Sequence, residues 1–416
     1  MSPGPGRTAI VIGGSISGLT AALLLRRQGW SVEVFERVES ELAGRGAGIV
    51  THPDLFVVLR SAGIEIPSDI GVAVEGRCVF AHDGSYLAER HHPQILTSWD
   101  RLYQLLRTRI PDDHYHKGRN LVRIEQGGAG VVGRFADGTS AAADLLVGAD
   151  GLRSAVRAQY LPVVQPAYAG YIAWRGLVDE ARIGAAARAD LFRHFAFSLP
   201  DGEQMLGYPV AGPGNDTRVG YRRYNWVWYR PADGSALADL LRDESGHVHD
   251  VSIPPPLIRA DVVAAVREAA GRVLSPQFAE LVGLSAQPFF QPIYDLETPR
   301  MAIGRVALIG DAAFVARPHV GAGITKAARD AGALATALQG CDGDIDGGLL
   351  TFERERLQEG SRIIARARHL GAYMQAQIDT PEERRNAATF RTPEAIMRDT
   401  ASLDFLHAQD TRPALN

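Results

Sequence analysis

The alternation of apolar and polar positions at the start of the chain predicts a βαβ unit over residues 8–36. An apolar run, "TAIVIG", precedes a glycine-rich turn, then "SGLTAALLLRRQG" with apolar residues at helical spacing, and then a second apolar run, "SVEVFE". Gly29 closes the predicted helix. Strands joined through a helix lie parallel, so the segment predicts a doubly wound α/β layer.

Three later segments extend this layer. Residues 100–110, "DRLYQLLRTRI", have helical spacing, whereas residues 121–149 combine short alternating runs with "GGAG" and "ADG" turns. The latter pattern is typical of an antiparallel ribbon that returns into a buried strand. From residue 301 we expect a buried strand in "RVALIGDAA", a glycine-containing turn, a helix in "GITKAARDAGALATAL" and a long helix from about 350 to 378.

The middle of the chain has a different pattern. Residues 166–230 are rich in aromatic side chains within short β-like runs: "YIAWRGLV", "LFRHFAFSL", "EQMLGYPV" and "YNWVWYR". This favours an antiparallel sheet, inserted as a second domain into the first. We expect "YNWVWYR" to belong to the sheet core rather than to enclose a ring ligand. The polar residues at the end of the chain predict a loosely packed tail.

The composition of the chain argues against several classes of protein, among them nucleic-acid-binding, membrane-spanning and secreted proteins. The chain has 416 residues, 46% of them hydrophobic and 22% charged, which favours a soluble protein with a large core. A net charge of −4 without a long basic run gives little support for a nucleic-acid or anionic-membrane partner. Cys78 and Cys341 lie far apart and no Cys/His cluster predicts a metal site, so we expect a reducing, cytoplasmic location. Seven residues before the first apolar run are too few for a secretory signal, and no apolar stretch could span a bilayer.

The turn at residues 13–18, "GGSISG", nearly matches the dinucleotide-binding fingerprint G-x-G-x-x-G, with Ser15 at the second glycine position. In that fingerprint Gly13 makes the tight turn and Gly18 lets helix and strand pack closely. Ile16 and Ser17 then offer backbone N–H groups at the positive end of a helix to a phosphate. Because Ser15 is small and its hydroxyl can donate, the departure weakens the motif without destroying it.

A carboxylate in the expected place supports the nucleotide site. Glu36 ends the second predicted strand, 18 residues beyond Gly18, and such a carboxylate accepts hydrogen bonds from both adenosine ribose hydroxyls and repels a 2′-phosphate. Arg37, next to it, is included among the expected cofactor-binding residues. This segment alone leaves NAD and FAD as alternatives.

Two downstream motifs resemble a known family. "LLVGADGLRSAVR" (145–157) and "GRVALIGDAAFVARPHVGAGITKAARDAGALATAL" (304–338) are similar to signatures of the class A FAD-dependent aromatic hydroxylases, which have the p-hydroxybenzoate hydroxylase fold. The resemblance implies a Rossmann-like FAD-binding domain with a parallel sheet, an inserted antiparallel β-sheet substrate domain and C-terminal helices. We expect residues 1–75, 100–165 and 285–378 in the FAD-binding domain, 76–99 and 166–284 in the substrate domain, and 379–416 as a C-terminal tail.

The same resemblance implies roles for individual residues. Asp311 would accept hydrogen bonds from the flavin ribityl chain, Asp150 and Gly151 would contact FAD and lie near the path of the reduced nicotinamide, and Arg101 would reach the pyrophosphate. The alternatives are a helix N-cap for Asp311, a simple turn for the Asp-Gly pair and a surface charge for Arg101. The loop after Asp311 would direct backbone N–H groups towards the isoalloxazine ring; its expected contacts are Pro318, Gly321, Ala322, Gly323 and Ile324.

The chain departs from the family pattern at two positions. Many members have His after "GDAA" and Asn in the glycine loop, where this chain has Phe314 and Thr325. The missing Asn leaves open how the flavin ring is held.

The resemblance implies an FAD-dependent monooxygenase that uses NADH or NADPH as a transient co-substrate and O2, and transfers oxygen from a flavin hydroperoxide. The expected substrate is a hydroxylated N-heteroaromatic ring such as a dihydroxypyridine, with a phenol or hydroxybenzoate as the alternative. His52, Tyr208 and His319 are the candidates for moving the substrate proton. A flavin dehydrogenase or reductase, or a non-catalytic flavin or NAD sensor, are the competing functions. We also expect a homodimer.

Overall fold

The computed structural model describes residues 6–42, 48–128 and 130–407. One of its sheets has six strands in the order β16-β17-β10-β1-β2-β6. Strands β1, β2, β10 and β17 run parallel, with α1 (Ile16–Arg27) between β1 and β2, so the predicted βαβ unit is confirmed. The bounds are β1 (Thr8–Ile12), β2 (Ser31–Phe35), β6 (Tyr115–His116), β10 (Leu145–Gly148), β16 (Ala302–Ile303) and β17 (Val306–Leu308).

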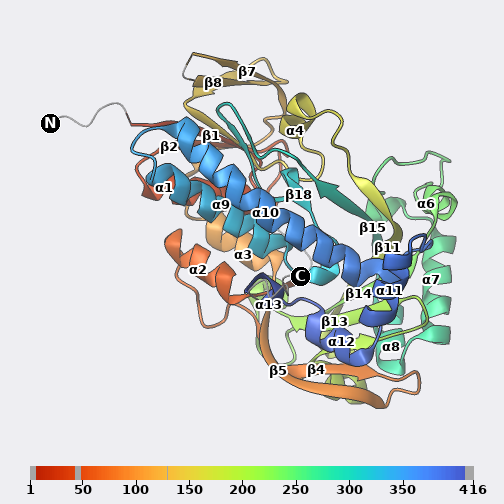
Figure 1. Ribbon diagram of the computed structural model, residues 1–416. Coiled ribbons are helices and arrows are strands. Elements are labelled where there is room, and N and C mark those ends of the chain that lie inside the picture. Colours follow the sequence, from red (N-terminus) through yellow and green to blue (C-terminus); the bar gives the residue numbers. More distant parts are fainter. Residues whose placement is uncertain (1–5, 43–47, 129, 408–416) are drawn as a thin grey trace, which may run out of the picture.

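Helices cover one face of this sheet. The buried side of α9 (Gly323–Gln339) packs between α1 and α10 (Ile345–Gly371), and α10 runs along the molecule from one domain to the other (Figure 1). Helices α2 (Pro53–Ser61) and α3 (Trp99–Arg107) flank this layer. The predicted long helix is confirmed but is displaced towards the N-terminus, because Asp344 caps it by accepting from the Gly347 N–H group.

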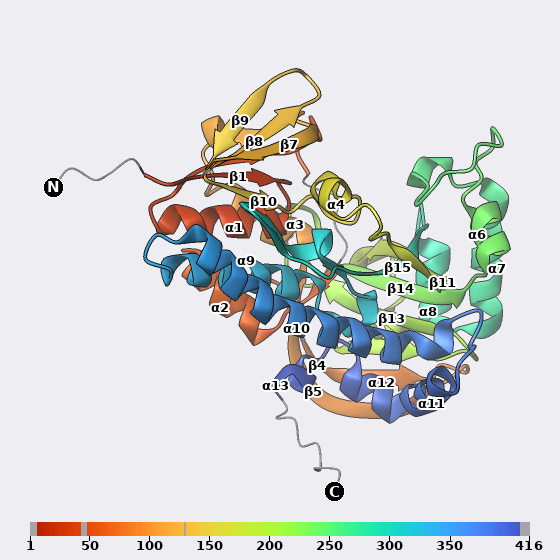
Figure 2. The same cartoon turned by 45° about the horizontal axis from the view of Figure 1, so that its top comes forward.

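The opposite side carries the predicted ribbon. Strands β7 (Leu121–Gly127), β8 (Gly130–Phe135) and β9 (Ser140–Ala143) form an antiparallel sheet that stands at the edge of the molecule (Figure 2). Next along the chain are the buried strand β10 and the short helix α4 (Ala155–Tyr160).

The second sheet has nine strands in the order β18-β15-β11-β14-β13-β12-β4-β5-β3. It is antiparallel except where β12 runs parallel to β4, which confirms the predicted class of sheet. Its strands are β3 (Gly48–Val50), β4 (Val72–Phe80), β5 (Tyr86–Ser98), β11 (Ala167–Asp179), β12 (His194–Ser198), β13 (Gln204–Val210), β14 (Arg223–Pro231), β15 (Phe289–Glu297) and β18 (Phe314–Val315). β3, β15 and β18 come from segments assigned above to the FAD-binding domain, and the domain limits stay a prediction.

The two faces of this sheet have different neighbours because successive side chains point to opposite sides. Trp174, Trp226 and Trp228 belong to a core beneath helices α5 (Ala185–Leu191), α7 (Ala260–Val273) and α8 (Pro276–Leu284). The indole N–H of Trp226 donates to Ser285 Oγ at 2.8 Å. The tryptophans of "YNWVWYR" therefore lie in the sheet core, as predicted, and Val227 and Tyr229 belong to a different core on the other face.

The C-terminal segment is packed, so the expectation of a loose tail is wrong for its described part. It forms α11 (Pro381–Phe390), α12 (Pro393–Asp399) and α13 (Asp404–His407) next to β4 and β5 (Figure 2). The buried guanidinium of Arg77, on β4, donates to the carbonyl oxygens of Met397 at 2.7 Å and Thr400 at 2.6 Å. The polar composition was misleading because a few apolar residues, Arg77 and two arginines of α10, Arg362 and Arg366, anchor these helices. Residues 408–416 lie outside the described residues.

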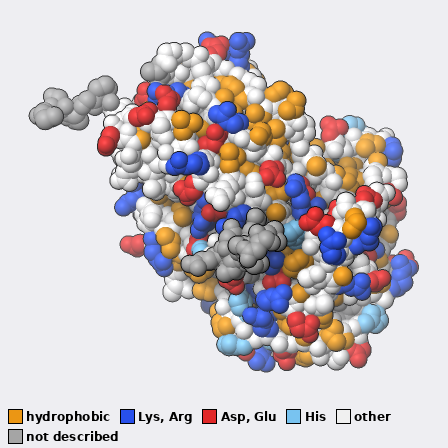
Figure 3. Space-filling view, viewed as in Figure 1, with side chains coloured by type: hydrophobic (Ala, Val, Ile, Leu, Met, Phe, Trp, Pro, Cys, Tyr) orange, Lys and Arg blue, Asp and Glu red, His pale blue; other side chains and the backbone are white. Residues whose placement is uncertain are grey.

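One face of the molecule carries charges of both signs. Figure 3 shows basic and acidic side chains interspersed over the face that it presents. Within the described ranges, no helix is long and apolar enough to cross a membrane, and no group of three or more His, Cys, Asp or Glu side chains is placed to hold a metal ion.

We predict that Arg77→Leu lowers the free energy of unfolding by about 2–4 kcal/mol, because it leaves two buried carbonyl groups without a charged donor. Residues 379–407 should also become sensitive to limited proteolysis. The control is Arg193→Leu, which removes an exposed ion pair with Glu75 and should have a much smaller effect in the same urea titration. Equal losses in the two variants would contradict the anchoring role of Arg77.

Candidate active site

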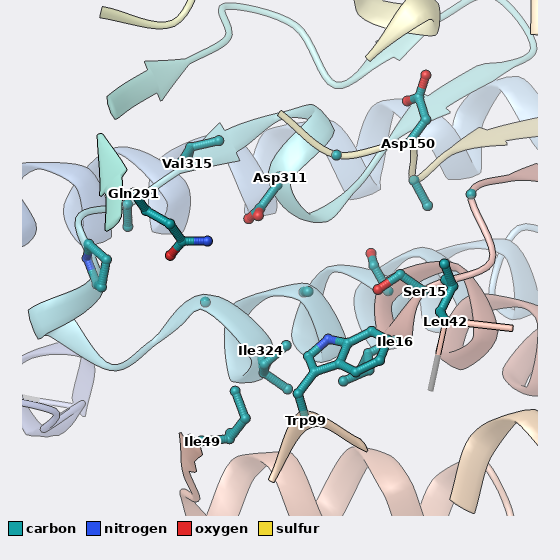
Figure 4. Close-up of a pocket in the computed structure, with 18 of the residues that line it drawn as sticks. Ser15, Ile16, Leu42, Ile49, Trp99, Asp150, Gln291, Asp311, Val315 and Ile324 are labelled. Atoms are coloured by element: carbon teal, nitrogen blue, oxygen red, sulfur yellow. The ribbon is translucent and has the colours of Figure 1, made fainter. Parts of the chain in front are cut away.

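A cavity of about 610 Å³ lies between the two sheets. One wall is formed where β1, β2, β10 and β17 end, and the other is the face of the nine-stranded sheet opposite the tryptophan core. Ligands in open α/β sheets bind at this edge because the strand ends and helix N-termini converge there. Figure 4 shows the carboxylate of Asp311 and the amide of Gln291 pointing into the space above Trp99, Ile49 and Ile324.

The glycine turn forms one end of this cavity. Gly13 has φ +108, and a Cβ there would collide with the carbonyl of Ala149; a Cβ on Gly18 would collide with the carbonyl of Gly13. Ser15 occupies the N-cap position of α1 with an extended backbone, and its side chain forms no hydrogen bond to the helix. The buried Oγ of Ser17 has no hydrogen-bond partner among the described residues. This turn therefore leaves a cradle with free hydroxyl and N–H donors, which suits a phosphate. Gly13, Ser15, Ile16 and Ser17 line the cavity, and Gly18 supports it from behind.

Glu36 organises the same turn. Its Oε2 accepts from the Gly14 N–H group at 2.8 Å and its Oε1 from the Val38 N–H group at 3.0 Å. The side chain still lines the cavity, as does Arg37. Because each carboxylate oxygen accepts more than one hydrogen bond, Glu36 can hold the turn and also accept from ribose hydroxyls.

Asp311 projects from a short turn, η5 (Gly310–Ala312), after β17. Gly310 has φ +61; its N–H group donates to Asp330 Oδ2 at 2.9 Å, and its carbonyl accepts from Lys326 Nζ at 3.0 Å. The Asp311 side chain is open to the cavity and otherwise enclosed by protein. This enclosure raises the pKa of Asp311, Lys326 opposes the rise and Asp330 adds to it. The carboxyl group is therefore well placed to share hydrogen bonds with hydroxyl groups of a ligand.

The glycine loop follows as η6 (Pro318–Val320) and the start of α9. Gly321 has φ +65, and a Cβ on it would overlap Ala401 from the C-terminal segment, itself at φ +51. The Ala401 N–H group donates to the His319 carbonyl at 2.9 Å. The expected contacts Pro318, Gly321, Gly323 and Ile324 line the cavity, whereas Ala322 is buried behind them.

Asp150 lines the cavity and lies two residues beyond the end of β10. Its Oδ2 accepts from the N–H groups of Ala155 at 2.7 Å and Val156 at 3.2 Å, and its buried Oδ1 has no partner among the described residues. Burial raises the pKa of Asp150. The turn expected as an alternative is present, with Gly151 at φ +75, and the Asp150 carboxylate holds the start of α4 against this turn.

Arg101 does not reach the cavity. Its Nη2 pairs with Asp69 at 2.7 Å, and its backbone N–H group donates to the N-cap Ser98. Trp99, from the same helix turn, lines the cavity in its place. A contact from Arg101 to a pyrophosphate stays a prediction.

His52 lies behind the glycine loop rather than in the described lining of the cavity. Its Nδ1 is 3.0 Å from Thr325 Oγ1 and its Nε2 is 3.3 Å from the Ala401 carbonyl. Since a carbonyl only accepts, Nε2 carries the proton and Nδ1 accepts from the Thr325 hydroxyl. Burial lowers the pKa of His52 to about 4, so the ring is neutral at pH 7. This geometry favours a positioning role, and Thr325, at the usual Asn position, serves as the partner of His52.

His319 and Tyr208 do line the cavity. Nε2 of His319 is 3.2 Å from the Ala367 carbonyl and 3.3 Å from the Tyr171 hydroxyl, and burial lowers the His319 pKa to about 3. Burial raises the pKa of Tyr208, with Arg175 opposing the rise. Which group handles the substrate proton stays a prediction.

The polar lining residues that sequence reasoning missed include Arg175, Tyr229 and Gln291 on the antiparallel sheet; the others are Arg119, Asn120, Arg153 and Thr400. Arg175 and Tyr229 lie within recognised strands, and the alternation of those strands could have placed them on the face opposite the tryptophans. Gln291 required the pairing of β15 with β11, which joins residues more than 100 positions apart.

The family model for an FAD binding domain matches residues 7–175 and 291–367, and a second, FAD binding domain-like model matches residues 168–295. The chain belongs to the FAD binding domain family. A relative in this family, 2,6-dihydroxypyridine 3-monooxygenase of Paenarthrobacter nicotinovorans, is 35% identical over 381 residues, which cover 90% of this chain and 93% of the relative.

Two solved structures have the same fold. The structure of 2,6-dihydroxypyridine-3-hydroxylase from Arthrobacter nicotinovorans superposes with a TM-score of 0.83 at 32% identity, covering 91% of this chain and 96% of that one. Klebsiella pneumoniae HpxO, complexed with FAD and uric acid, gives a TM-score of 0.75 at 24% identity and covers 94% and 95% of the two chains; this match shows the fold alone. The protein is an FAD-dependent monooxygenase of the aromatic hydroxylase fold, and its FAD-binding domain motifs lie at the cavity.

We predict that Gly13→Val abolishes FAD binding, because the added atoms enter the backbone of the turn. Ser15→Gly should leave the FAD dissociation constant within about threefold, since the Ser15 side chain caps nothing and Gly is tolerated at an N-cap. Flavin titration by fluorescence quenching of both variants, with circular dichroism to check folding, tests this. A comparable loss of affinity in Ser15→Gly would show that its hydroxyl is required.

We predict acid destabilisation from the two buried histidines. Their pKa values lie below the ordinary 6.5, so the unfolded chain binds protons that the folded chain does not, and the free energy of unfolding should fall as the pH decreases from about 6.5 towards 4. His52→Asn should reduce this dependence in urea titrations between pH 7 and 4.5. His407→Asn, at an exposed position, is the control and should leave the slope unchanged.

Proposed function

We propose that the protein is an NAD(P)H- and FAD-dependent hydroxylase of a hydroxylated N-heteroaromatic ring such as a dihydroxypyridine. The observation that carries the proposal is the single cavity that joins the glycine turn and Glu36 to Asp311, the glycine loop and the antiparallel sheet face. Such continuity would place a dinucleotide's reactive ring against a substrate held by that sheet. The likeness to 2,6-dihydroxypyridine 3-monooxygenase supports the choice of substrate class.

The residues at the cavity fit FAD. Glu36 would bind the adenosine ribose, the N-terminus of α1 the pyrophosphate, and Asp311 the ribityl hydroxyls. Bound FAD would supply the redox and oxygen-transfer chemistry. The protein's part is to orient the ring through the backbone of Pro318–Ile324, to exclude water with apolar side chains such as Phe195 and Leu206, and to favour negative charge at the start of α9.

The alternatives from sequence stay as outcomes of the test: a phenol or hydroxybenzoate hydroxylase of the same fold, or a flavin-dependent dehydrogenase or reductase. We include a cytoplasmic location and a homodimer in the proposal. The described cysteines, Cys78 and Cys341, are free thiols, which supports a reducing compartment. The homodimer rests on the family resemblance.

We predict that the purified protein retains FAD and that 2,6-dihydroxypyridine stimulates its NADH or NADPH oxidation at least tenfold. Product mass after turnover in isotopically labelled O2 should show one incorporated oxygen atom. A panel of hydroxypyridines, phenols and hydroxybenzoates ranks the substrate classes by kcat/KM. Stimulated oxidation without labelled product would favour a dehydrogenase or reductase, and protein that binds no FAD after reconstitution would overturn the proposal.

A further inference from the structure

Four polar side chains on the substrate face of the cavity have no hydrogen-bond partner among the described residues. They are Arg175 on β11, Tyr208 on β13, Tyr229 on β14 and Gln291 on β15, and all four line the cavity. Tyr208 and Tyr229 are buried, Arg175 is half-buried with an enclosed Nε, and buried polar groups in folded proteins nearly always have partners. A set of unpaired donors and acceptors at one cavity wall therefore indicates the binding groups for a polar ligand.

Strand pairing brings these four residues together. Arg175 pairs with Val227 on β14, which pairs with Leu206 on β13. Tyr229 and Tyr208 each lie two positions from this pair, on opposite sides of it, because the two strands are antiparallel. On the other side of β11, Gln291 pairs with Ala173, two positions from Arg175. Because side chains two residues apart share a face, the guanidinium lies among the two phenols and the amide.

Arg175 is the only one of the four with a full charge. Its Nε is enclosed without a partner, and no described carboxylate forms an ion pair with its guanidinium. The acidic residues of the lining, Glu36, Asp150 and Asp311, follow strands of the other sheet. A half-buried cation without an anionic partner is destabilising, and an anion at this point would offset that cost.

We propose that the cavity takes its aromatic substrate as a monoanion and that Arg175 is the counter-ion of the deprotonated ring oxygen. The inference rests on the proposed function and adds the charge state of the substrate. The hydroxyl proton leaves to solvent, and the guanidinium stabilises the remaining anion. Tyr208, Tyr229 and Gln291 would bind the other heteroatoms of the ring.

This arrangement has a chemical consequence. Deprotonation raises the electron density of the ring, which favours its attack on an electrophilic oxygen. A fixed cation can hold the anionic form without taking the proton itself, so no general base has to lie on the sheet face. The other charged or titratable groups that line the same cavity come from the parallel-sheet side and the glycine loop: Glu36, Arg37, Arg119, Asp150, Arg153, Asp311 and His319. Neutral His319 contributes no competing charge at pH 7.

The test uses the FAD-loaded enzyme and two rings of similar size, 2,6-dihydroxypyridine and 2,6-difluoropyridine, of which only the first can ionise to an anion. Arg175→Gln removes the charge, Arg175→Lys retains it, and Arg182→Gln removes a charge from an exposed position in η2 (Glu180–Arg182) as the matched control. Ultraviolet difference spectra report the ionisation of the bound dihydroxypyridine, and flavin fluorescence reports the dissociation constants.

In the wild-type enzyme and in Arg182→Gln, the apparent pKa of bound 2,6-dihydroxypyridine should lie at least about one unit below its value in water. Arg175→Gln should abolish this lowering and weaken dihydroxypyridine binding at least tenfold, with little change for difluoropyridine. Arg175→Lys should keep most of the pKa lowering.

Retention of the lowered pKa in Arg175→Gln, or equal weakening of both rings, would overturn the role of Arg175. Loss of FAD rather than of substrate from Arg175→Gln would overturn it too, by assigning the cation to the cofactor. If the wild-type enzyme hydroxylates the ring without lowering its pKa, the charge inference fails and the hydroxylase function stands. If the FAD-loaded enzyme binds no ring of the hydroxypyridine, phenol and hydroxybenzoate panel, the proposed function fails, and this inference fails with it.

Discussion

The buried carboxylate of Asp330 connects the elements on which the cavity depends. It accepts from the Gly310 N–H group, from Lys326 Nζ at 2.8 Å and from Arg356 Nε at 2.9 Å, and so joins the Asp311 turn to α9 and α10. Asp330, Lys326 and Arg356 are almost completely inaccessible to solvent. Such a cluster adds little net stability compared with apolar packing, but the loss of one member leaves a buried charge without its partner. Its value lies in fixing the geometry of the turn that presents Asp311.

A second set of contacts joins the C-terminal segment to the same region. Ala401 contacts Gly321, donates its N–H group to the His319 carbonyl and accepts from His52, while Arg77 holds the preceding turn. Ala401 adopts a positive φ that an alanine rarely takes, and such strain persists only where the surroundings impose it. Residues more than 70 positions beyond the glycine loop thus complete one wall of the cavity, where Thr400 and Ala401 both belong to the lining.

The parts that sequence could predict are those encoded by local pattern. Gly13, Gly18 and Glu36 belong to one contiguous βαβ unit, and the Asp311 turn and glycine loop precede one helix. In both segments the motif and the neighbouring helix or strand can therefore be predicted from the same short stretch of sequence. The positions of Arg175, Tyr229 and Gln291 depended on register between strands far apart in the chain, which no local pattern fixes. The packing of residues 379–407 depended on Arg77, and the engagement of His52 on Ala401. Arg101 illustrates the converse: its place in a helix was predicted, but Asp69 rather than a phosphate is its partner.

The two walls of the cavity come from different sheets. Its carboxylates follow strands of the parallel sheet, where parallel strand ends and helix N-termini suit a dinucleotide with several hydroxyls and phosphates. The antiparallel sheet provides the opposite wall, and its alternation separates two tasks: tryptophans on one face build the core under α7 and α8, while polar side chains on the other face remain free for a ligand. Because neighbouring residues of one strand point to different faces, the side chains that face the substrate can be substituted without disturbing the tryptophan core. This independence explains how one fold can serve relatives named for different aromatic rings, such as 2,6-dihydroxypyridine and salicylate.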